Sequence, residues 1–367
     1  MQALILVGGE GTRLRPLTST VPKPVVSLVS QPFITYMLEW LRSHGVDDAV
    51  LSCGFKADRV RDVLGDGGGL GMRLRYVEEP EPLGTGGALK FAEQLLDERF
   101  LMLNGDVLTD IDLSAQLEQH ERTGARGTLA LIAVEDPSAY GLVRLQDDRS
   151  VTGFLEKPSP DQIDTKLVNA GAYVLEREVL AGMPEAGTNF SIERDVFPGL
   201  VGEGLYGFPV EAYWLDIGTP ERYLQATFDI LEGSVATQIG SRLADCGLCL
   251  VEDSEVAGRV LPPAFVGRGC RIEGQATVGG RAVLGAGVKI GEGAHVESSV
   301  VLDGATVGAH STVSGSIVGP GVVLGEHCRI EGGVVLGEGA SLGRDNALAA
   351  AARIFPGVHL PDGAIRF

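Results

Sequence analysis

Two stretches near the start of the 367-residue chain combine glycine with cationic side chains. The first is the loop Gly8-Gly9-Glu10-Gly11-Thr12-Arg13, and the second is Pro22-Lys23-Pro24. Backbone N–H groups of such a loop can face phosphate oxygens, and Arg13 and Lys23 can neutralise the phosphate charge. No Gly-Lys-Ser/Thr follows, so the loop is not a Walker A motif, and Arg13 stands where a dinucleotide fingerprint needs glycine. The pattern predicts a phosphate-binding loop of another kind.

Two aspartates follow apolar stretches that are typical of strands. Asp106 comes shortly after Phe100–Leu103, and Asp216 lies in a similar context before Gly218. Two carboxylates together with phosphate oxygens suit the octahedral coordination of Mg²⁺. The sequence therefore offers a metal site at Asp106 and Asp216, although either aspartate alone could equally be a turn or cap residue.

The first 230 residues alternate short apolar runs with helical patterns. Strands are predicted at Ala3–Val7, Ala49–Cys53, Leu74–Val77 and Phe100–Leu103. Helices are predicted at Pro32–His44, about Ala57–Leu64 and about Gly87–Leu96. This rhythm indicates an α/β fold with a Rossmann-like, mixed but mostly parallel sheet that helices cover on both faces. Ligands of such sheets bind beyond the carboxyl ends of the strands, where the glycine-rich loop and Asp106 would lie.

From about Gly258 the pattern changes to a six-residue repeat. Aliphatic residues recur at Val266, Ile272, Val278, Leu284, Ile290, Val296 and Leu302. Steps of five occur from Leu302 to Val307 and from Val313 to Val318, after which the period of six resumes. The repeat predicts a parallel β-helix of about four coils, with the aliphatic side chains inward and glycines at the corners. The predicted domains are 1–232, a connector at 233–257, and the β-helix with its cap at 258–367.

Composition excludes several classes of partner. The formal net charge of -19 argues against nucleic acid or an anionic membrane. Five cysteines are a sparse set, and we expect them to be thiols in a reducing cytoplasm. The apolar run Ala3–Val7 is too short for a signal peptide, and no stretch approaches the ~20 apolar residues of a membrane span.

The motifs together resemble those of the nucleotide-diphospho-sugar pyrophosphorylases, the sugar-1-phosphate nucleotidyltransferases. After the two stretches above, further motifs match in order at Glu79-Pro80, Leu83–Ala88, Asn104-Gly105-Asp106, Tyr140-Gly141, Glu156-Lys157-Pro158, Asn169-Ala170-Gly171 and Trp214–Pro220. The resemblance covers essentially the whole chain, because many members append a left-handed hexapeptide β-helix. The chain is most similar to the mannose-1-phosphate guanylyltransferases, and Ser191-Ile192-Glu193 followed by Phe197-Pro198 also resembles that branch.

The resemblance implies the reaction of an NTP with a sugar 1-phosphate to give an NDP-sugar and pyrophosphate, with Mg²⁺. The sugar phosphate attacks the α-phosphorus in line, so catalysis consists of positioning and charge neutralisation and needs no Ser or Cys nucleophile. The implied catalytic residues are Arg13, Lys23 and Asp106, and the implied metal ligands are Asp106 and Asp216.

The resemblance also implies two sets of binding residues. The nucleotide set is Leu6, Gly8, Gly9, Gly11, Thr12, Arg13, Lys23, Glu79, Gly84 and Thr85. The sugar-phosphate set is Gly141, Glu156, Lys157, Asn169 and Trp214. Lys157 would hold the phosphate, while Glu156 and Asn169 would bond sugar hydroxyls and so discriminate against a sugar that lacks them.

Glu79 bears on the choice of base. Thymidylyl and uridylyl members have Gln at this position, whose amide suits the N3–H and adjacent carbonyl of a pyrimidine. A carboxylate only accepts hydrogen bonds, so Glu79 could accept from guanine N1–H and N2–H₂ together. This favours GTP and hence GDP-mannose as product; the alternative is that Glu79 faces solvent in the acidic run 78–81.

Other functions stay open. Another nucleotide or glucose 1-phosphate could serve as substrate, and some relatives are non-catalytic regulatory subunits, although here the loop and the carboxylates are intact. Hexapeptide β-helices also host acyltransferases that use a histidine, but the inserted loop of many such enzymes is not visible around His295, His310 and His327. We expect the β-helix to serve regulation or assembly into a homo-oligomer.

Overall fold

A computed structural model describes residues 1–54, 56–243, 246–250 and 253–366. These form two compact units, the first of Met1–Glu10 with Tyr36–Trp214 and the second of Gly11–Thr35 with Leu215–Phe367. The predicted connector at 233–257 includes 244–245 and 251–252, and the predicted cap ends at 367; these positions lie outside the described residues. Within the described part, every helix is too short or too polar to span a lipid bilayer.

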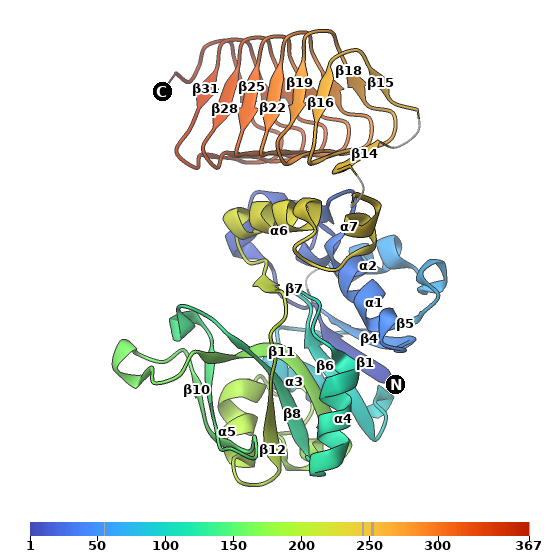
Figure 1. Ribbon diagram of the computed structural model, residues 1–367, viewed down its shortest axis with the longest axis vertical. Coiled ribbons are helices and arrows are strands. Elements are labelled where there is room, and N and C mark those ends of the chain that lie inside the picture. Colours follow the sequence, from blue (N-terminus) through green and yellow to red (C-terminus); the bar gives the residue numbers. More distant parts are fainter. Residues whose placement is uncertain (55, 244–245, 251–252, 367) are drawn as a thin grey trace. The chain divides into compact units, whose positions relative to one another are not determined.

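The first unit is built on a mixed sheet in which nine of the described strands take part. Its central strands run parallel in the order β6-β1-β4-β5, and they are β1 (Gln2–Leu6), β4 (Asp48–Cys53), β5 (Arg73–Glu78) and β6 (Arg99–Asn104). Beside β6 lies the antiparallel β11, and the remaining strands are β8 (Gly127–Ala133), β9 (Gly141–Leu145), β10 (Val151–Glu156), β11 (Leu167–Glu176) and β12 (Leu205–Pro209). The predicted mixed, mostly parallel α/β sheet is confirmed (Figure 1).

Helices pack on this sheet, and the first three along the chain were predicted from the apolar pattern whereas the last two were not. They are α1 (Phe33–Ser43), α2 (Ala57–Leu64), α3 (Gly84–Ala92), α4 (Leu113–Thr123) and the short α5 (Phe197–Leu200). Helix α3 starts three residues before its predicted start, because its first turn is rich in glycine and carries no apolar period. The core between sheet and helices contains Leu4, Phe100 and Tyr173, which are all fully buried. Local signals set the ends of α4, whose Asp112 side chain accepts from Ala115 N–H and whose Gly124 is left-handed.

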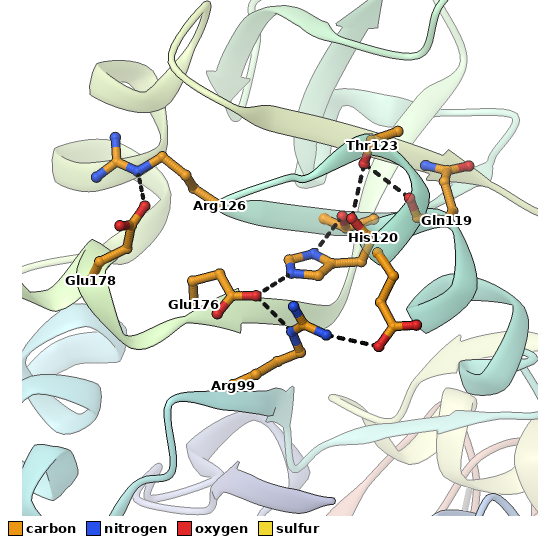
Figure 2. A network of polar contacts seen from close by, with 9 residues as sticks. Arg99, Gln119, His120, Thr123, Arg126, Glu176 and Glu178 are labelled. Atoms are coloured by element: carbon orange, nitrogen blue, oxygen red, sulfur yellow. Dashed lines mark hydrogen bonds and ion pairs between the residues drawn. The ribbon is translucent and has the colours of Figure 1, made fainter.

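A buried polar network ties α4 to β8 and β11. The ring of His120 is 2.9 Å from Thr128 Oγ1 through Nδ1 and 3.0 Å from Glu176 Oε1 through Nε2. Arg99 donates to the same Glu176 oxygen at 2.6 Å and to Glu121 at 2.8 Å (Figure 2). Burial lowers the pKa of His120, although the hydrogen bond to Glu176 opposes this shift. The neutral imidazole is therefore the form that fits this site.

The second unit contains the predicted parallel β-helix, which is confirmed. Its strands stack into three parallel sheets, clearly visible as successive coils in Figure 1. The first sheet is β14 (Leu248–Leu250), β17 (Ala264–Val266), β20 (Ala282–Leu284), β23 (Val300–Val301), β26 (Ile317–Val318), β29 (Val335–Leu336) and β32 (Arg353–Ile354). The second is β15 (Glu255–Val256), β18 (Arg271–Ile272), β21 (Lys289–Ile290), β24 (Thr306–Val307), β27 (Val323–Leu324), β30 (Ser341–Leu342) and β33 (His359–Leu360). The third is β16 (Arg259–Leu261), β19 (Thr277–Gly279), β22 (His295–Glu297), β25 (Thr312–Ser314), β28 (Arg329–Glu331) and β31 (Ala347–Leu348).

Two details of the repeat differ from the prediction. The described residues contain seven strands in each of two sheets and six in the third, so the coils number more than the four predicted. Strands β14 and β15 lie before Gly258, where the six-residue pattern is too weak to recognise. In addition, Leu284 pairs with Val301 and not with Leu302. The inward-pointing residue at this step is therefore Val301, one residue earlier than predicted. Adjacent aliphatic residues at Val301 and Leu302 hid this step, because the sequence could not decide which of the two points inward.

The glycines of the repeat have two different tasks. A row of corners is left-handed at Gly269, Gly287, Gly304, Gly321, Gly339 and Gly357. Glycines that directly follow the inward aliphatic residue instead leave room for the next coil: a Cβ on Gly267 would lie 2.8 Å from the Gly285 carbonyl carbon. Another corner row uses Gln275, His310, His327 and Asp345 at positive φ, so glycine is not needed at every corner.

Helix α6 (Pro220–Glu232) lies along one face of the β-helix. It begins with Thr219 as N-cap and Pro220 in its first turn, and it ends at the left-handed Gly233. Near its start, Glu221 pairs with Arg353 of β32 at 3.0 Å. Near its end, Phe228 lies 4.7 Å beneath the guanidinium of Arg281. The outward side chains of this first sheet, such as Phe265 and Val283, are consequently buried. The short α7 (Gln238–Leu243) follows.

Candidate active site

The carboxyl ends of β5, β4 and β1 hold a group of residues that we call the Glu79 cluster: Gly8, Ser52, Glu79 and Leu83. Glu79 directly follows β5, and its carboxylate accepts from Ser52 Oγ at 2.9 Å through Oε1 and from Leu83 N–H at 3.2 Å through Oε2. A Cβ on Gly8 would lie 3.0 Å from Glu79 Oε1, so only glycine brings the start of the loop this close. Glu79 is half-buried rather than exposed, unlike its neighbour Glu78.

The next strand end, between β1 and β6, carries Asp106. Leu6 pairs with Asn104 in the parallel register, and Gly105 N–H donates to the Leu6 carbonyl at 2.9 Å. A Cβ on Gly105 would lie 2.5 Å from that carbonyl oxygen. Glycine at 105 therefore lets the turn close over the end of β1 and places Asp106, which is partly exposed, at the ligand edge of the sheet.

Farther along the same edge lies the Glu156 cluster, which we define as Gly141, Glu156, Asn169 and Trp214. Glu156 ends β10 and pairs with Gly141 of β9, where a Cβ would lie 2.9 Å from Glu156 Oε2. Within the described residues, no hydrogen bond reaches the carboxylate of Glu156. Burial raises its pKa, and the carboxylate of Glu193 adds to that shift while Lys157 and Arg194 oppose it. This is an acceptor without a protein donor.

Asn169 is oriented by its neighbours. Its Nδ2 donates to the Tyr173 hydroxyl at 2.8 Å and its Oδ1 accepts from Gly171 N–H at 3.1 Å. Gly171 has φ +73°, and a Cβ there would lie 2.7 Å from Asn104 Nδ2. The turn at 169–171 thus packs directly on the end of β6, with the fully buried Tyr173 beneath it.

An aromatic pair closes the other side of the Glu156 cluster. The indole N–H of Trp214 donates to the Ala170 carbonyl at 2.8 Å. Tyr140 meets the Trp214 ring edge to face, with centroids 5.2 Å apart. Lys157 follows Glu156 at φ +53° and donates its backbone N–H to the Tyr140 carbonyl at 3.0 Å. Its side chain is exposed and the local backbone is one that lysine rarely adopts.

Gly84 and Thr85, which were predicted to bind the nucleotide, are in contact with residues 190–193 of the protein. Thr85 Oγ1 donates to Glu193 at 2.5 Å and accepts from Ile192 N–H at 3.0 Å. A Cβ on Gly84 would lie 2.5 Å from the Phe190 carbonyl oxygen. These two residues therefore connect α3 to 190–193, and their binding role remains a prediction.

In the second unit, a compact turn carries the cationic side chains. Gly11 is left-handed at φ +60°, and its carbonyl accepts from Thr18 Oγ1 at 2.7 Å. A Cβ on Gly11 would lie 3.1 Å from the Cβ of Lys23. Thr12 and Arg13 follow in a 3₁₀ turn, Thr12–Leu14, and Lys23 is buried at the start of another, Lys23–Val25. Gly11 and Lys23 are thus brought together.

Asp216 lies near Arg13 within this same unit. A Cβ on Gly218 would lie 2.8 Å from an Arg13 guanidinium nitrogen and 3.3 Å from Asp216 Oδ1. Arg222 of α6 pairs with Asp216 Oδ2 at 3.4 Å. The glycine in the Asp216-Ile217-Gly218 stretch therefore leaves space for the arginine beside the carboxylate.

The fit of a divalent cation follows from the donors available. Among the residues that the structure describes, no three His, Cys, Asp or Glu side chains gather into a metal-binding group. A cation held by one or two aspartates must take further oxygen ligands from substrate or water, which is how proteins commonly bind Mg²⁺. Asp106 and Asp216 each carry oxygen donors of the kind that this requires, and their role as ligands of one ion remains a prediction.

Several residues of the edge were missed from the sequence. Ser52 and Tyr173 are single polar side chains in strands, with no motif around them, and their contacts come from distant elements. Glu193 is nine-tenths buried, and Ser191 Oγ donates to it at 2.6 Å. The only available signal was its position in Ser191-Ile192-Glu193. In the β-helix, His310 and His327 stack with ring centroids 5.2 Å apart on one corner row.

Family models match both parts of the chain. The model described as nucleotidyl transferase matches residues 2–233. The model described as the GMPPB C-terminal domain matches residues 260–361.

Individual proteins are similar over most of the chain. A mannose-1-phosphate guanylyltransferase of Mycobacterium tuberculosis is 39% identical over 100% of this chain and 98% of its own length. A mannose-1-phosphate guanylyltransferase catalytic subunit beta of Drosophila pseudoobscura is 35% identical over 74% and 72%. Among solved structures, HddC of Yersinia pseudotuberculosis complexed with GMP-PN is 31% identical with a TM-score of 0.53, over 61% of this chain and 97% of its own.

Proposed function

The chain belongs to the nucleotidyl transferase family and is an enzyme of that class, and from this premise we propose that it makes GDP-mannose and pyrophosphate from GTP and mannose 1-phosphate. The observation that carries the proposal is full-length similarity to a protein named mannose-1-phosphate guanylyltransferase, at 39% identity. The Glu79 cluster supports the choice of GTP, because its half-buried carboxylate presents only acceptors at the ligand edge.

In this proposal, the Glu79 cluster receives the base. Guanine offers N1–H and N2–H₂ side by side, and each oxygen of a carboxylate can accept a further hydrogen bond. A base with a carbonyl at that place would meet repulsion. The glycines at 8, 9 and 11 would direct backbone N–H groups toward the phosphates, with Leu6 and Thr12 beside them in the sequence.

The cations then carry the chemistry. Arg13 would neutralise charge on the triphosphate and the leaving pyrophosphate, and Lys23 would act near the α-phosphorus. The sugar-phosphate oxygen attacks, and the bond from the α-phosphorus to the bridging oxygen of pyrophosphate breaks. Both substrates bring their own nucleophile and leaving group, so the protein must align them rather than form a covalent intermediate.

Asp106 and Asp216 are the proposed carboxylates for Mg²⁺. When bound, this ion would supply charge neutralisation to the phosphate oxygens at the transition state. Among these side chains, Lys23 is buried and Asp216 is paired with Arg222, so the proposed charges are held in place by the fold.

The Glu156 cluster is proposed to hold the sugar phosphate. The carboxylate of Glu156 and the amide of Asn169 would bond sugar hydroxyls, Trp214 and the Gly141 backbone would bound the sugar ring, and Lys157 would hold the phosphate. The five cysteines are free thiols, and a cytoplasmic location remains part of the proposal. Assembly into a homo-oligomer through the β-helix remains part of the proposal.

A matrix of substrates tests the proposal. The protein is incubated with Mg²⁺, each of GTP, ATP, UTP, CTP and dTTP, and each of several hexose 1-phosphates, and pyrophosphate release and product mass are measured. We expect the largest kcat/KM for GTP with mannose 1-phosphate. A larger value for dTTP or UTP with glucose 1-phosphate would replace the proposed substrates, and no pyrophosphate from any pair would contradict catalysis.

A further inference from the structure

We propose that Ser52 is a positioning residue for base selection, whose hydroxyl holds the Glu79 carboxylate in the orientation that accepts from a guanine base. This inference rests on the proposed function. It concerns the protein's own contacts behind the base rather than the base contacts themselves.

The first observation is the position of Ser52. It is the penultimate residue of β4, fully buried, and it pairs with Leu6 of β1 on one side and Val77 of β5 on the other. Its Cβ direction is therefore fixed by two parallel ladders, and its hydroxyl donates to Glu79 Oε1 at 2.9 Å. A hydrogen bond to a charged acceptor from so rigid a donor orients the acceptor strongly.

The second observation is that both protein neighbours of this carboxylate are donors. Ser52 Oγ donates to Oε1, and the backbone N–H of Leu83 donates to Oε2 at 3.2 Å. Glu79 N–H itself donates to the Cys53 carbonyl at 2.8 Å, which fixes the backbone from which the side chain starts. With one bond on each oxygen, the torsion of the carboxylate is set, and a remaining acceptor site on each oxygen is left for ligand.

The third observation is the space around Oε1. A Cβ on Gly8 would lie 3.0 Å from this oxygen, and a Cβ on Gly54 would lie 2.7 Å from the Gly8 carbonyl oxygen. Glycine at both positions lets the backbone close in on the carboxylate from the β1 side. If Ser52 lost its hydroxyl, Oε1 would lose the side-chain donor that balances the Leu83 bond, and the carboxylate could rotate about its last torsion.

The arrangement also explains why Gln would differ at position 79. The Leu83 N–H can only donate, so the amide oxygen of Gln would turn toward it and the NH₂ would face Ser52. The group would then present a donor beside an acceptor. That pattern suits a pyrimidine N3–H with its neighbouring carbonyl, and no longer two adjacent N–H donors.

The test compares Ser52→Ala with Ser52→Thr, which keeps a hydroxyl, and with Glu79→Gln. The matched control is Ser299→Ala, which removes an equally buried hydroxyl of the β-helix that donates to the Glu297 carbonyl. For each variant, kcat/KM is measured for GTP and for dTTP at saturating mannose 1-phosphate, together with KM for mannose 1-phosphate and the thermal midpoint.

We expect Ser52→Ala to reduce the GTP-to-dTTP selectivity about 3- to 10-fold, as loss of one orienting hydrogen bond implies. Ser52→Thr and Ser299→Ala should retain wild-type selectivity, and KM for mannose 1-phosphate should stay unchanged. Unchanged selectivity in Ser52→Ala, with a shift in Glu79→Gln, would overturn the role of Ser52 and leave the base assignment standing. Unchanged selectivity in both would overturn the base assignment as well. If Ser52→Thr does not fold, the comparison of Ser52→Ala with Ser299→Ala still tests whether the Ser52 hydroxyl sets the GTP-to-dTTP selectivity.

Discussion

The Glu79 cluster and the Glu156 cluster each place one carboxylate at the ligand edge of the same sheet, but the protein holds them differently. Glu79 accepts one hydrogen bond on each oxygen from the protein. Glu156 accepts none within the described part of the chain, and burial raises its pKa. The first acceptor is oriented before any ligand arrives, whereas the second is left to be satisfied by a ligand.

The lack of a protein donor at Glu156 costs stability, but it also allows a ligand to be selected. A half-buried acceptor without a donor costs stability, and such a group gains when a ligand donor reaches it. We infer that the Glu79 cluster selects by a fixed pattern of acceptors. The Glu156 cluster selects by requiring the substrate to supply the missing donors, which sugar hydroxyls can do.

The largest effect should come from Asp106, at the strand end between the two clusters. Replacing it with Asn removes a negative charge while keeping shape, and we expect kcat to fall about 100- to 1,000-fold with any NTP. Steady-state pyrophosphate release checks this, with Asp62→Asn as control for charge loss at an exposed helical site. Near-normal turnover in Asp106→Asn would contradict its role in catalysis.

A smaller effect, confined to the Glu156 cluster, should follow from Gly171→Ala. The added Cβ would meet Asn104 at 2.7 Å on a left-handed backbone, and the resulting shift would displace Asn169. We expect a decrease of about 10- to 100-fold in kcat/KM for the sugar phosphate, since displacements near 1 Å are costly. Gly182→Ala is the control, because nothing lies within 4 Å of its Cβ position. An equal loss of GTP-to-dTTP selectivity would break the separation of the two clusters.

The pH dependence of KM for mannose 1-phosphate further distinguishes the Glu156 cluster from the Glu79 cluster. The raised pKa of Glu156 means that its carboxylate protonates at a higher pH than an ordinary glutamate, and the protonated form is a poorer acceptor. KM for mannose 1-phosphate should therefore rise as pH falls toward that pKa, by up to about tenfold per pH unit below it. Glu156→Gln cannot titrate, so its profile records the substrate phosphate alone. Superimposable profiles in the two proteins would contradict this prediction.

The smallest effect concerns His120, which lies in neither cluster. Its pKa is lowered in the folded protein, so below about pH 6.5 the unfolded chain binds a proton that the folded protein does not. The free energy of unfolding therefore contains the full contribution of neutral His120 above that pH. It declines as pH falls toward the folded pKa, by at most about 1.4 kcal/mol per pH unit. The lowered pKa of Glu176 acts at more acidic pH.

Urea unfolding between pH 5 and 7.5 measures this slope in wild type and in His120→Gln. We expect the variant to have a shallower slope in that window and unchanged NTP selectivity. Equal slopes would show that His120 does not contribute.

The sequence predicted the regular parts of this molecule well, for a physical reason. In the β-helix each coil repeats the previous one, so a local period specifies the contacts; the prediction erred in the number of coils and where Val301 and Leu302 gave two equivalent choices. The parallel strands were equally readable from their apolar runs. The contacts of Ser52 with Glu79, or of Thr85 with Glu193, join residues 27 and 108 positions apart. No local pattern encodes such contacts, because they depend on strand order and on the glycines that permit close approach.

The most direct test of the comparison is a crossed measurement on Glu79→Gln and Glu156→Gln. For both variants and the wild type, GTP-to-dTTP selectivity and KM for mannose 1-phosphate are determined under the same conditions. The account predicts that Glu79→Gln lowers the selectivity and leaves the sugar-phosphate KM unchanged, and that Glu156→Gln raises that KM and leaves the selectivity unchanged. If each substitution moved both quantities alike, the two carboxylates would not have separate tasks.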